Sequence, residues 1–194
     1  MNHDLFLFLN AGDDPAPFWI GIAYLLAVYA VLLLPLKLVF DWLWGTQEDR
    51  RLALGVLMAL VAAGAVNLLI GAFWYVPRPA EAGIGHCYLA HAADSSFPSD
   101  HATVLFAALW VYALARRLAA AAMMLVTGVA VGWARIYLGV HFPLDIMGAL
   151  VVGLIAAVLS RGVMGFAGSG ILLVAQAIYR RLFSPMIRLG WFRN

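Results

Sequence analysis

Charged residues are scarce in this chain. Lys, Arg, Asp and Glu together make up 11% of its 194 residues, and the formal net charge is only +2. A soluble domain carries about 25% charged residues, so this chain has too few charges to cover a surface in water. The small net charge gives no sign of a nucleic-acid partner. We therefore expect a membrane protein whose partner is the lipid bilayer, with no nucleic acid.

Cysteine is also nearly absent. The chain has one cysteine, Cys87, which excludes an intrachain disulfide and a cysteine-based metal site. The familiar nucleotide and zinc motifs are missing as well, because there is no Walker-type loop, no G-x-G-x-x-G and no H-E-x-x-H. Any chemistry must come from other residues, and we expect neither a metal ion nor a cofactor.

Apolar residues, in contrast, are abundant. They make up 65% of the chain, and the mean hydropathy is +0.93. Five long apolar stretches each predict a transmembrane helix: residues 18–40, 52–76, 101–115, 119–138 and 142–160. A sixth candidate, 162–179, is weakened by four glycines in its first half. The sequence predicts an all-α, polytopic transmembrane bundle of five spans, with six as the alternative, in a single domain over residues 1–194.

The positions of the cations predict an orientation. Lys and Arg in short loops are retained on the cytoplasmic side. Six of them follow the first, third and fifth spans: Lys37, Arg50, Arg51, Arg116, Arg117 and Arg161. Only Arg78 and Arg135 lie on the opposite side. The loops 77–100 and 135–145 are therefore expected to face away from the cytoplasm.

The end of the chain is basic and amphipathic. After Asp145 no acidic residue follows, while apolar side chains alternate with Arg180, Arg181, Arg188 and Arg193. This pattern favours a C-terminal segment that folds back onto an anionic cytoplasmic leaflet. The alternative is a solvated basic end with no lipid role.

A group of ionisable residues clusters in and next to the two external loops. His141 and Asp145 are four residues apart, and Pro143 between them suits the first turn of a helix, so both side chains should project from one face. A carboxylate that holds one imidazole nitrogen leaves the other free to act as a base or a nucleophile. We therefore expect a catalytic histidine with an orienting aspartate.

Other residues nearby are suited to an anion. Arg78 and Arg135 each offer a planar fork of donors that matches phosphate oxygens. At Pro98-Ser99-Asp100-His101 the chain enters a helix, where backbone N–H groups and the Ser99 hydroxyl can seat an anion. Ser99 is equally a candidate N-cap, and His101 is available as a proton donor. Together these groups predict phosphoryl transfer.

The same residues resemble a known family. Arg78-Pro79, Pro98-Ser99-Asp100-His101 and Arg135-x5-His141-x3-Asp145 are similar to the three motifs of the type 2 phosphatidic acid phosphatase superfamily, written K-x6-R-P, P-S-G-H and S-R-x5-H-x3-D. The resemblance covers roughly residues 67–150, with the motifs within 71–145, and is strongest to bacterial undecaprenyl-diphosphatases of the bacitracin-resistance type. The chain departs from the motifs at Gly71, Asp100 and Ala134, which replace lysine, glycine and serine.

The resemblance implies roles for the site residues. His141 would attack the terminal phosphorus and form a phospho-histidine, Asp145 would orient it, and His101 would protonate the leaving oxygen. Three further residues would hold the phosphoryl oxygens: Arg78, Arg135 and Ser99. The implied reaction is hydrolysis of undecaprenyl diphosphate to the monophosphate at the external face of the inner membrane, which recycles the carrier lipid of cell-wall synthesis.

Several alternatives remain open at this point. Candidates for auxiliary roles are Asp100, His91 and Pro98. His86 or His91 could replace the lysine missing at Gly71. A metal site could be built from His91, His101, His141, Asp94 and Asp145. A phosphatase for phosphatidylglycerol phosphate, phosphatidic acid or lipid A, or a lipid phosphotransferase, would use the same catalytic residues. The non-enzymatic alternative is a membrane scaffold or transporter.

Overall fold

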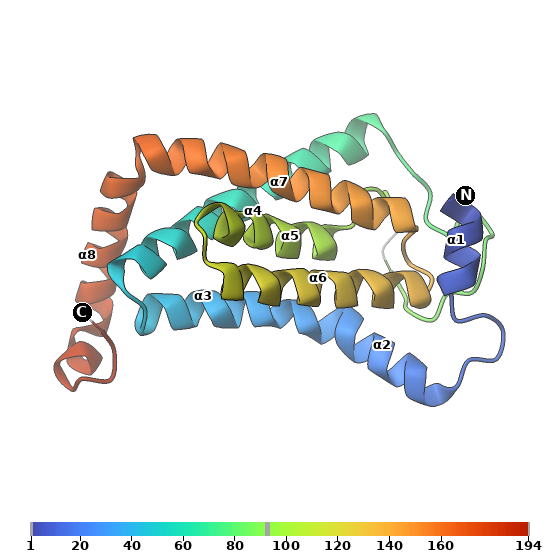
Figure 1. Ribbon diagram of the computed structural model, residues 1–194, viewed down its shortest axis with the longest axis horizontal. Helices are drawn as coiled ribbons and strands as arrows, with labels where there is room; N and C mark the ends of the chain where they lie inside the picture. The colour runs from blue at the N-terminus through green and yellow to red at the C-terminus, as the bar shows by residue number, and fades with distance from the viewer. Residues whose placement is uncertain (1, 92–93, 194) are drawn as a thin grey trace.

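The computed structural model describes residues 2–91 and 94–193, and within these ranges the chain is helical without any strand. The elements are α1 (Asn2–Leu9), α2 (Pro17–Tyr29), the short 3₁₀ helix η1 (Ala30–Leu32), α3 (Leu33–Leu43), α4 (Gln47–Phe73), α5 (Asp100–Leu114), α6 (Leu118–Tyr137), α7 (Pro143–Phe166) and α8 (Gly168–Arg188). They form an elongated bundle with α1 near one end and α8 across the other (Figure 1). We call these the α1 end and the α8 end.

All five predicted spans are helical, which confirms the predicted all-α membrane bundle. Four segments are long and apolar enough to cross a membrane: Pro17–Leu43, α4, α6 and α7. The fifth, α5, is apolar but has only 15 residues. The first span is not one straight helix, because η1 interrupts it between α2 and α3 (Figure 1). Pro35 explains the break, since proline lacks an N–H and its ring clashes with the carbonyl four residues earlier, at Val31 in η1.

Helix α5 is the centre of the bundle. It lies against α4, α6 and α7 (Figure 1), and most of its side chains are buried, including Leu105, Phe106 and Tyr112. Small residues allow the close packing. A Cβ atom added at Gly153 of α7 would lie 2.7 Å from the backbone nitrogen of Ala107, so the two helix backbones are nearly in contact there.

The C-terminal helix does not continue through the bundle. Figure 1 shows α8 turning away from α7 and running across the α8 end, as expected for five spans with a folded-back basic segment. Arg50 anchors this arrangement: it is 1% exposed, and its guanidinium donates to the carbonyl oxygens of Trp42 and Arg193 and lies over the ring of Tyr179. The sequence places Arg50 in the loop after the first span, whereas in the structure it belongs to the first turn of α4 and ties the chain end to that helix.

The contact at Gly153 yields a test of the packing. Gly153→Val should lower the free energy of unfolding by about 2 kcal/mol or more, because the new side chain overlaps the backbone of α5. Gly162→Val on the same helix is the matched control, since a Cβ there meets no atom within 4 Å. Thermal unfolding in detergent would measure both, and equal stability of the two variants would contradict the close contact of α5 and α7.

Candidate active site

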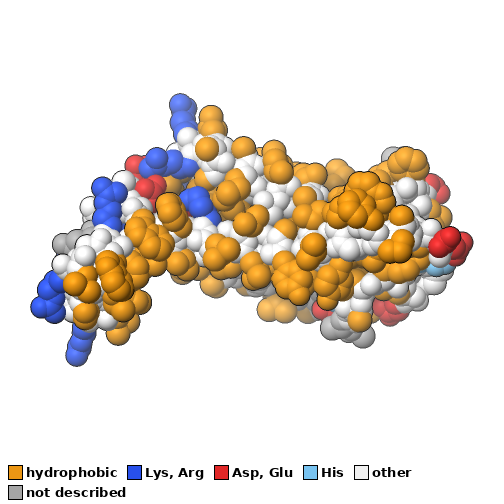
Figure 2. Space-filling view, turned by 90° about the horizontal axis from the view of Figure 1, so that it is seen from below, with side chains coloured by type: hydrophobic (Ala, Val, Ile, Leu, Met, Phe, Trp, Pro, Cys, Tyr) orange, Lys and Arg blue, Asp and Glu red, His pale blue; other side chains and the backbone are white. Residues whose placement is uncertain are grey.

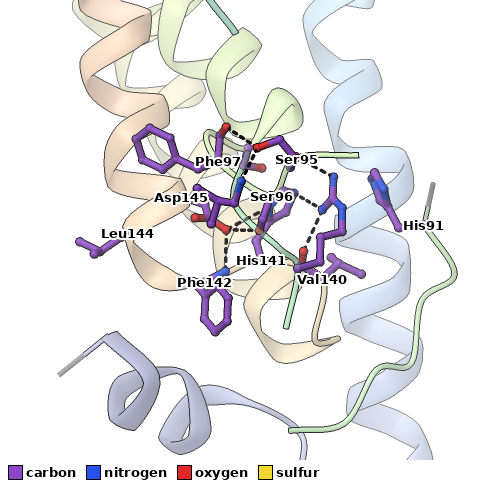
Figure 3. A network of polar contacts seen from close by, with 12 residues as sticks. His91, Ser95, Ser96, Phe97, Val140, His141, Phe142, Leu144 and Asp145 are labelled. Atoms are coloured by element: carbon purple, nitrogen blue, oxygen red, sulfur yellow. Dashed lines mark hydrogen bonds and ion pairs between the residues drawn. The ribbon is translucent and has the colours of Figure 1, made fainter. Parts of the chain in front are cut away.

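The predicted pair of His141 and Asp145 is brought together at the α1 end. The Nδ1 atom of His141 lies 3.3 Å from Oδ2 of Asp145, and both residues are at most 2% exposed. The same oxygen accepts hydrogen bonds from the Ser96 hydroxyl at 2.5 Å and from the Phe142 backbone N–H at 2.7 Å (Figure 3). Asp145 therefore holds His141 from the Nδ1 side and leaves Nε2 as the atom available for reaction.

The local sequence explains this placement. Phe142 precedes α7, Pro143 is its first residue, and Asp145 lies in its first turn. A proline suits the first turn of a helix because no N–H is needed there. The Asp145 carboxylate then satisfies the free N–H of Phe142 and interacts favourably with the positive end of the helix dipole.

Arg78 reaches the other nitrogen of the histidine. Its Nη1 lies 3.3 Å from Nε2 of His141 and donates to the carbonyl of Val140 at 2.8 Å. Its Nε and Nη2 both donate to Oδ1 of Asp94, at 3.0 and 2.7 Å. Arg78 is 7% exposed, so it is a buried cation beside the reactive nitrogen, with the Asp94 carboxylate as its counter-ion. Sequence reasoning found Arg78 but not this ion pair.

The charges around these residues act on their ionisation. Burial, followed by the charges of Arg135 and Arg78, lowers the pKa of His141 well below its usual value of about 6.5. Burial opposes ionisation of Asp94, but its hydrogen bonds to Arg78 and the charge of that residue outweigh burial, so the pKa of Asp94 is lowered. His141 is therefore neutral at pH 7. With Nδ1–H directed at Asp145, its Nε2 carries the lone pair.

Two buried groups have donors that the protein leaves unused. Arg135 is 2% exposed, and its Nη1 makes a long hydrogen bond of 3.4 Å to the carbonyl of Ala27, while Nε and Nη2 have no partner among residues 2–91 and 94–193. Ser99 is fully buried, and its hydroxyl likewise has no partner in the part of the chain that the structure describes. Although Ser99 occupies the N-cap position of α5, its side chain makes no capping bond. Ser99 is therefore the N-cap residue by position, as predicted, while its hydroxyl remains available to an anion.

Unused buried donors are unfavourable, by about 1–3 kcal/mol each, so they point to a ligand that would accept their hydrogen bonds. Arg135 interacts electrostatically with both His141 and Arg78, and Ser99 directly precedes the first turn of α5. An anion with several oxygens, located next to Nε2 of His141, would satisfy all of these groups.

Two polar residues were missed by the sequence analysis. Ser96 supplies the shortest hydrogen bond to Asp145. Asn67 of α4 donates through Nδ2 to Asp100 at 2.6 Å and to Thr103 at 3.3 Å. The sequence did contain a signal for Asn67, namely an amide in an otherwise apolar span. Burial of such a polar group is favourable only if it has hydrogen-bond partners. Asp100 is thereby directed toward α4 and neutral amide donors.

The loop histidines differ in position. The ring of His91 is 6.2 Å from that of His141, and its Nδ1 is 3.5 Å from Oδ1 of Asp94, so His91 borders the site. His86 instead pairs with Asp13 at 2.8 Å. Pro98 is buried directly before Ser99, and His101 is half-buried in the first turn of α5. Of the two histidines considered in place of the missing lysine, only His91 is close to His141.

Gly71 leaves space beside the site where the family motif has lysine. A Cβ at Gly71 would lie 3.5 Å from Cβ of Ser95. The residue lines a cavity of about 250 Å³ together with Asn67, Asp94 and Asp100. Within residues 2–91 and 94–193, no three His, Cys, Asp or Glu side chains are grouped so that they could hold a metal ion. The geometry therefore gives no support to the alternative metal site.

Comparison with known proteins identifies the family. The family described as the PAP2 superfamily matches residues 52–168. The chain belongs to the PAP2 superfamily. All three predicted motifs lie within the matched range, and with its helical bundle the protein is a multi-pass membrane phosphatase.

Individual relatives cover most of the chain. It is 36% identical over 194 residues to the Escherichia coli (strain K12) protein named "Putative undecaprenyl-diphosphatase YbjG", which is all of this chain and 98% of that protein. It is 32% identical to the undecaprenyl-diphosphatase BcrC of Bacillus subtilis (strain 168), over 80% of each chain.

Two crystal structures share the fold. The structure of Aquifex aeolicus LpxE has a TM-score of 0.64 and 27% identity, with 83% of this chain and 94% of that chain covered. A PAP2-type phosphatidylglycerolphosphate phosphatase from Bacillus subtilis has a TM-score of 0.59 and 22% identity, with 83% of both chains covered. The second likeness is informative about the fold alone.

The unused donors predict an unusual stability effect. Arg135→Gln should leave the ligand-free protein as stable as the wild type or more stable, because it removes unsatisfied buried donors. The same change should weaken binding of orthovanadate, a phosphate mimic, by about tenfold to a hundredfold. Thermal unfolding with increasing vanadate would measure both effects, with exposed Arg116→Gln as the control. Unchanged vanadate stabilisation of folded Arg135→Gln would contradict an anion site at Arg135.

Proposed function

We propose that this protein hydrolyses undecaprenyl diphosphate to undecaprenyl phosphate and inorganic phosphate, through a phosphorylated His141. The observation that supports this most directly is the buried His141, held by Asp145 at Nδ1 and facing a guanidinium at Nε2. We infer that residues 1–194 act as one membrane domain, with the catalytic motifs within 71–145. No metal ion or cofactor enters the proposed reaction.

The proposed reaction has two steps. First, Nε2 of His141 attacks the terminal phosphorus. An N–P bond forms, the P–O bond to the lipid phosphate breaks, and His101 donates a proton to the leaving oxygen. Asp145 stabilises the charge that develops on the imidazole. In the second step, water attacks the phosphorus and releases inorganic phosphate, which restores the imidazole, and His101 recovers its proton from that water.

The transferred phosphoryl group would be held by donors aimed at its oxygens. Arg78 already lies beside Nε2, and Arg135 and Ser99 have hydrogen-bond donors without a partner among the described residues. Such fixed donors lower the barrier because negative charge is spread over the equatorial oxygens in the transition state. Arg78 would exchange the Asp94 carboxylate for a phosphoryl oxygen when substrate binds. Asp94 is thus proposed as a displaceable counter-ion.

The substrate is proposed from the relatives. Both relatives named above carry undecaprenyl-diphosphatase in their names, and the matches cover at least 80% of this chain. A lipid diphosphate also suits a site at a helix end inside the bundle, since the apolar tail can remain in the bilayer while the diphosphate reaches His141. The other phosphatase substrates and the phosphotransferase reaction are outcomes of the assay below.

The site is proposed to face the periplasm or cell exterior. Figure 2 shows Lys and Arg side chains gathered toward the α8 end, while histidine and most of the visible acidic side chains lie toward the α1 end. Because cytoplasmic loops retain the excess of Lys and Arg, the α8 end would be cytoplasmic. The catalytic site would then lie on the external side of a bacterial inner membrane.

The first experiment tests the reaction and its residues. Purified protein is assayed with chelator present for phosphate release from undecaprenyl diphosphate, phosphatidylglycerol phosphate, phosphatidic acid and a lipid A phosphate. We expect the highest kcat/KM with undecaprenyl diphosphate. His141→Ala should lose about a thousandfold or more, and His101→Ala about a hundredfold or more.

The matched control is His86→Ala, because His86 is a histidine of the loop between α4 and α5 that pairs with Asp13. It should retain nearly full activity. Full activity of His141→Ala would refute the mechanism, loss of activity with chelator would revive the metal alternative, and a clear preference for another lipid would change the substrate.

The pH dependence follows from the lowered pKa of His141. The neutral imidazole is the reactive form, so the acid limb of kcat/KM should follow the low pKa of His141, well below 6.5. Arg78→Gln removes one of the positive charges that lower this pKa, so its acid limb should move to higher pH. A wild-type acid limb at or above pH 6.5, or a shift to lower pH in Arg78→Gln, would contradict this assignment.

Orientation is tested with single cysteines in a Cys87→Ser background. Ala82→Cys is in an exposed loop at the α1 end, and Gln47→Cys is exposed at the α8 end. A membrane-impermeant maleimide added to intact cells should label Ala82→Cys and spare Gln47→Cys. The reverse pattern would place the catalytic site on the cytoplasmic side.

A further inference from the structure

The α8 end of the bundle contains a cavity that the proposed reaction does not use. Helix α5 has 15 residues, whereas α4 has 27 and α7 has 24. At 1.5 Å per residue, α5 is about 22 Å long and is shorter than its neighbours by roughly 14–18 Å. Where α5 ends, α4 and α7 diverge (Figure 1). A cavity of about 420 Å³ lies there, between the first turns of α4, the last turn of α5 and the last turns of α7.

The wall of this cavity is apolar. Leu52, Val111, Leu114 and Met164 line it, together with small residues such as Gly165. A Cβ atom at Gly165 would meet no other atom within 4 Å, so the absence of a side chain there keeps the space open. The volume is within the range of about 300–1,000 Å³ that is typical of ligand sites.

Positive charge lies at the rim. Arg51 and Arg161 are exposed cavity-lining residues. Glu48 also lines the cavity, but Arg117 neutralises it through an ion pair of 2.9 Å. Among the described residues, neither Arg51 nor Arg161 has an ion-pair partner, although Arg51 donates to the carbonyl of Met164 at 3.1 Å. An apolar wall with two uncompensated guanidinium groups at its edge matches an amphiphile with an anionic head.

We propose that this cavity binds an anionic phospholipid of the leaflet at the α8 end. The phosphate of the headgroup lies between Arg51 and Arg161, and part of an acyl chain packs along the apolar wall. A zwitterionic lipid matches the two positive charges less well, and a soluble anion leaves the wall exposed to water. The site is separate from the catalytic site, since the two lie at opposite ends of α5.

The charge at the rim can be tested by lipid binding. The purified protein is titrated with phosphatidylglycerol and, separately, with phosphatidylcholine, and the bound lipid is counted by native mass spectrometry. We expect preferential binding of phosphatidylglycerol. The double variant Arg51→Gln/Arg161→Gln should weaken that binding by about fivefold for each arginine removed.

A matched double variant distinguishes the cavity from the basic surface of α8. Arg180→Gln/Arg181→Gln removes two exposed charges from α8 and should weaken phosphatidylglycerol binding much less than Arg51→Gln/Arg161→Gln does. An equal loss in both double variants would place the lipid on the surface of α8 and overturn the proposal. Equal binding of phosphatidylglycerol and phosphatidylcholine by the wild type would also overturn it.

A second pair of variants tests the apolar wall. Gly165→Leu should fill the cavity and abolish most phosphatidylglycerol binding, whereas Gly162→Leu, on the same helix but outside the cavity, should bind as the wild type does. Thermal unfolding would show that both variants are folded. Full binding by folded Gly165→Leu would contradict occupation of the cavity by an acyl chain. Because binding is measured without turnover, these outcomes are independent of the reaction proposed for His141.

Discussion

One oxygen of the Asp145 carboxylate holds the catalytic end of the molecule together. It accepts hydrogen bonds from the Ser96 side chain and the Phe142 backbone and lies beside Nδ1 of His141. The partners come from the loop before α5 and the loop before α7, and the carboxylate itself is on α7. A carboxylate with 2% exposure is favourable only if such partners are present, so the same bonds that make its burial tolerable also fix His141. The orientation of His141, the proposed nucleophile, is thus a consequence of how α7 begins.

The shortness of the central helix α5 determines the structure at both ends of the bundle. The bond between Asn67 and Asp100 places the start of α5 level with Asn67, six residues before α4 ends at Phe73, or about 9 Å below that end. Ser99 and His101 are therefore recessed into the bundle, where, in the proposed reaction, fixed donors would act on a phosphoryl group with little competition from water. At the opposite end, the same shortness of α5 leaves the apolar cavity rimmed by Arg51 and Arg161.

Much of this arrangement could be predicted from sequence because it depends on local spacing. Hydrophobic length located the spans, and the four-residue separation placed His141 and Asp145 on one face. The pairing of Arg78 with Asp94, the burial of Arg50 and the contact of Asn67 with Asp100 could not be predicted. They join residues that are 16, 143 and 33 positions apart in the chain, and such contacts depend on how the helices tilt and cross. The sequence left open whether the Ser99 hydroxyl caps α5 or faces an anion, since its direction is determined by packing at the start of α5.

If Nε2 of His141 is the nucleophile, the enzyme must form a covalent phospho-histidine, and trapping that intermediate is the most direct test. Undecaprenyl diphosphate carrying a radiolabelled terminal phosphate would be mixed with the enzyme and quenched with base within one turnover, and the label mapped by mass spectrometry. We expect an acid-labile phosphoryl group on His141 in the wild type and none in His141→Ala. A label on another residue, or single-turnover release of phosphate with no labelled protein at any time, would contradict it.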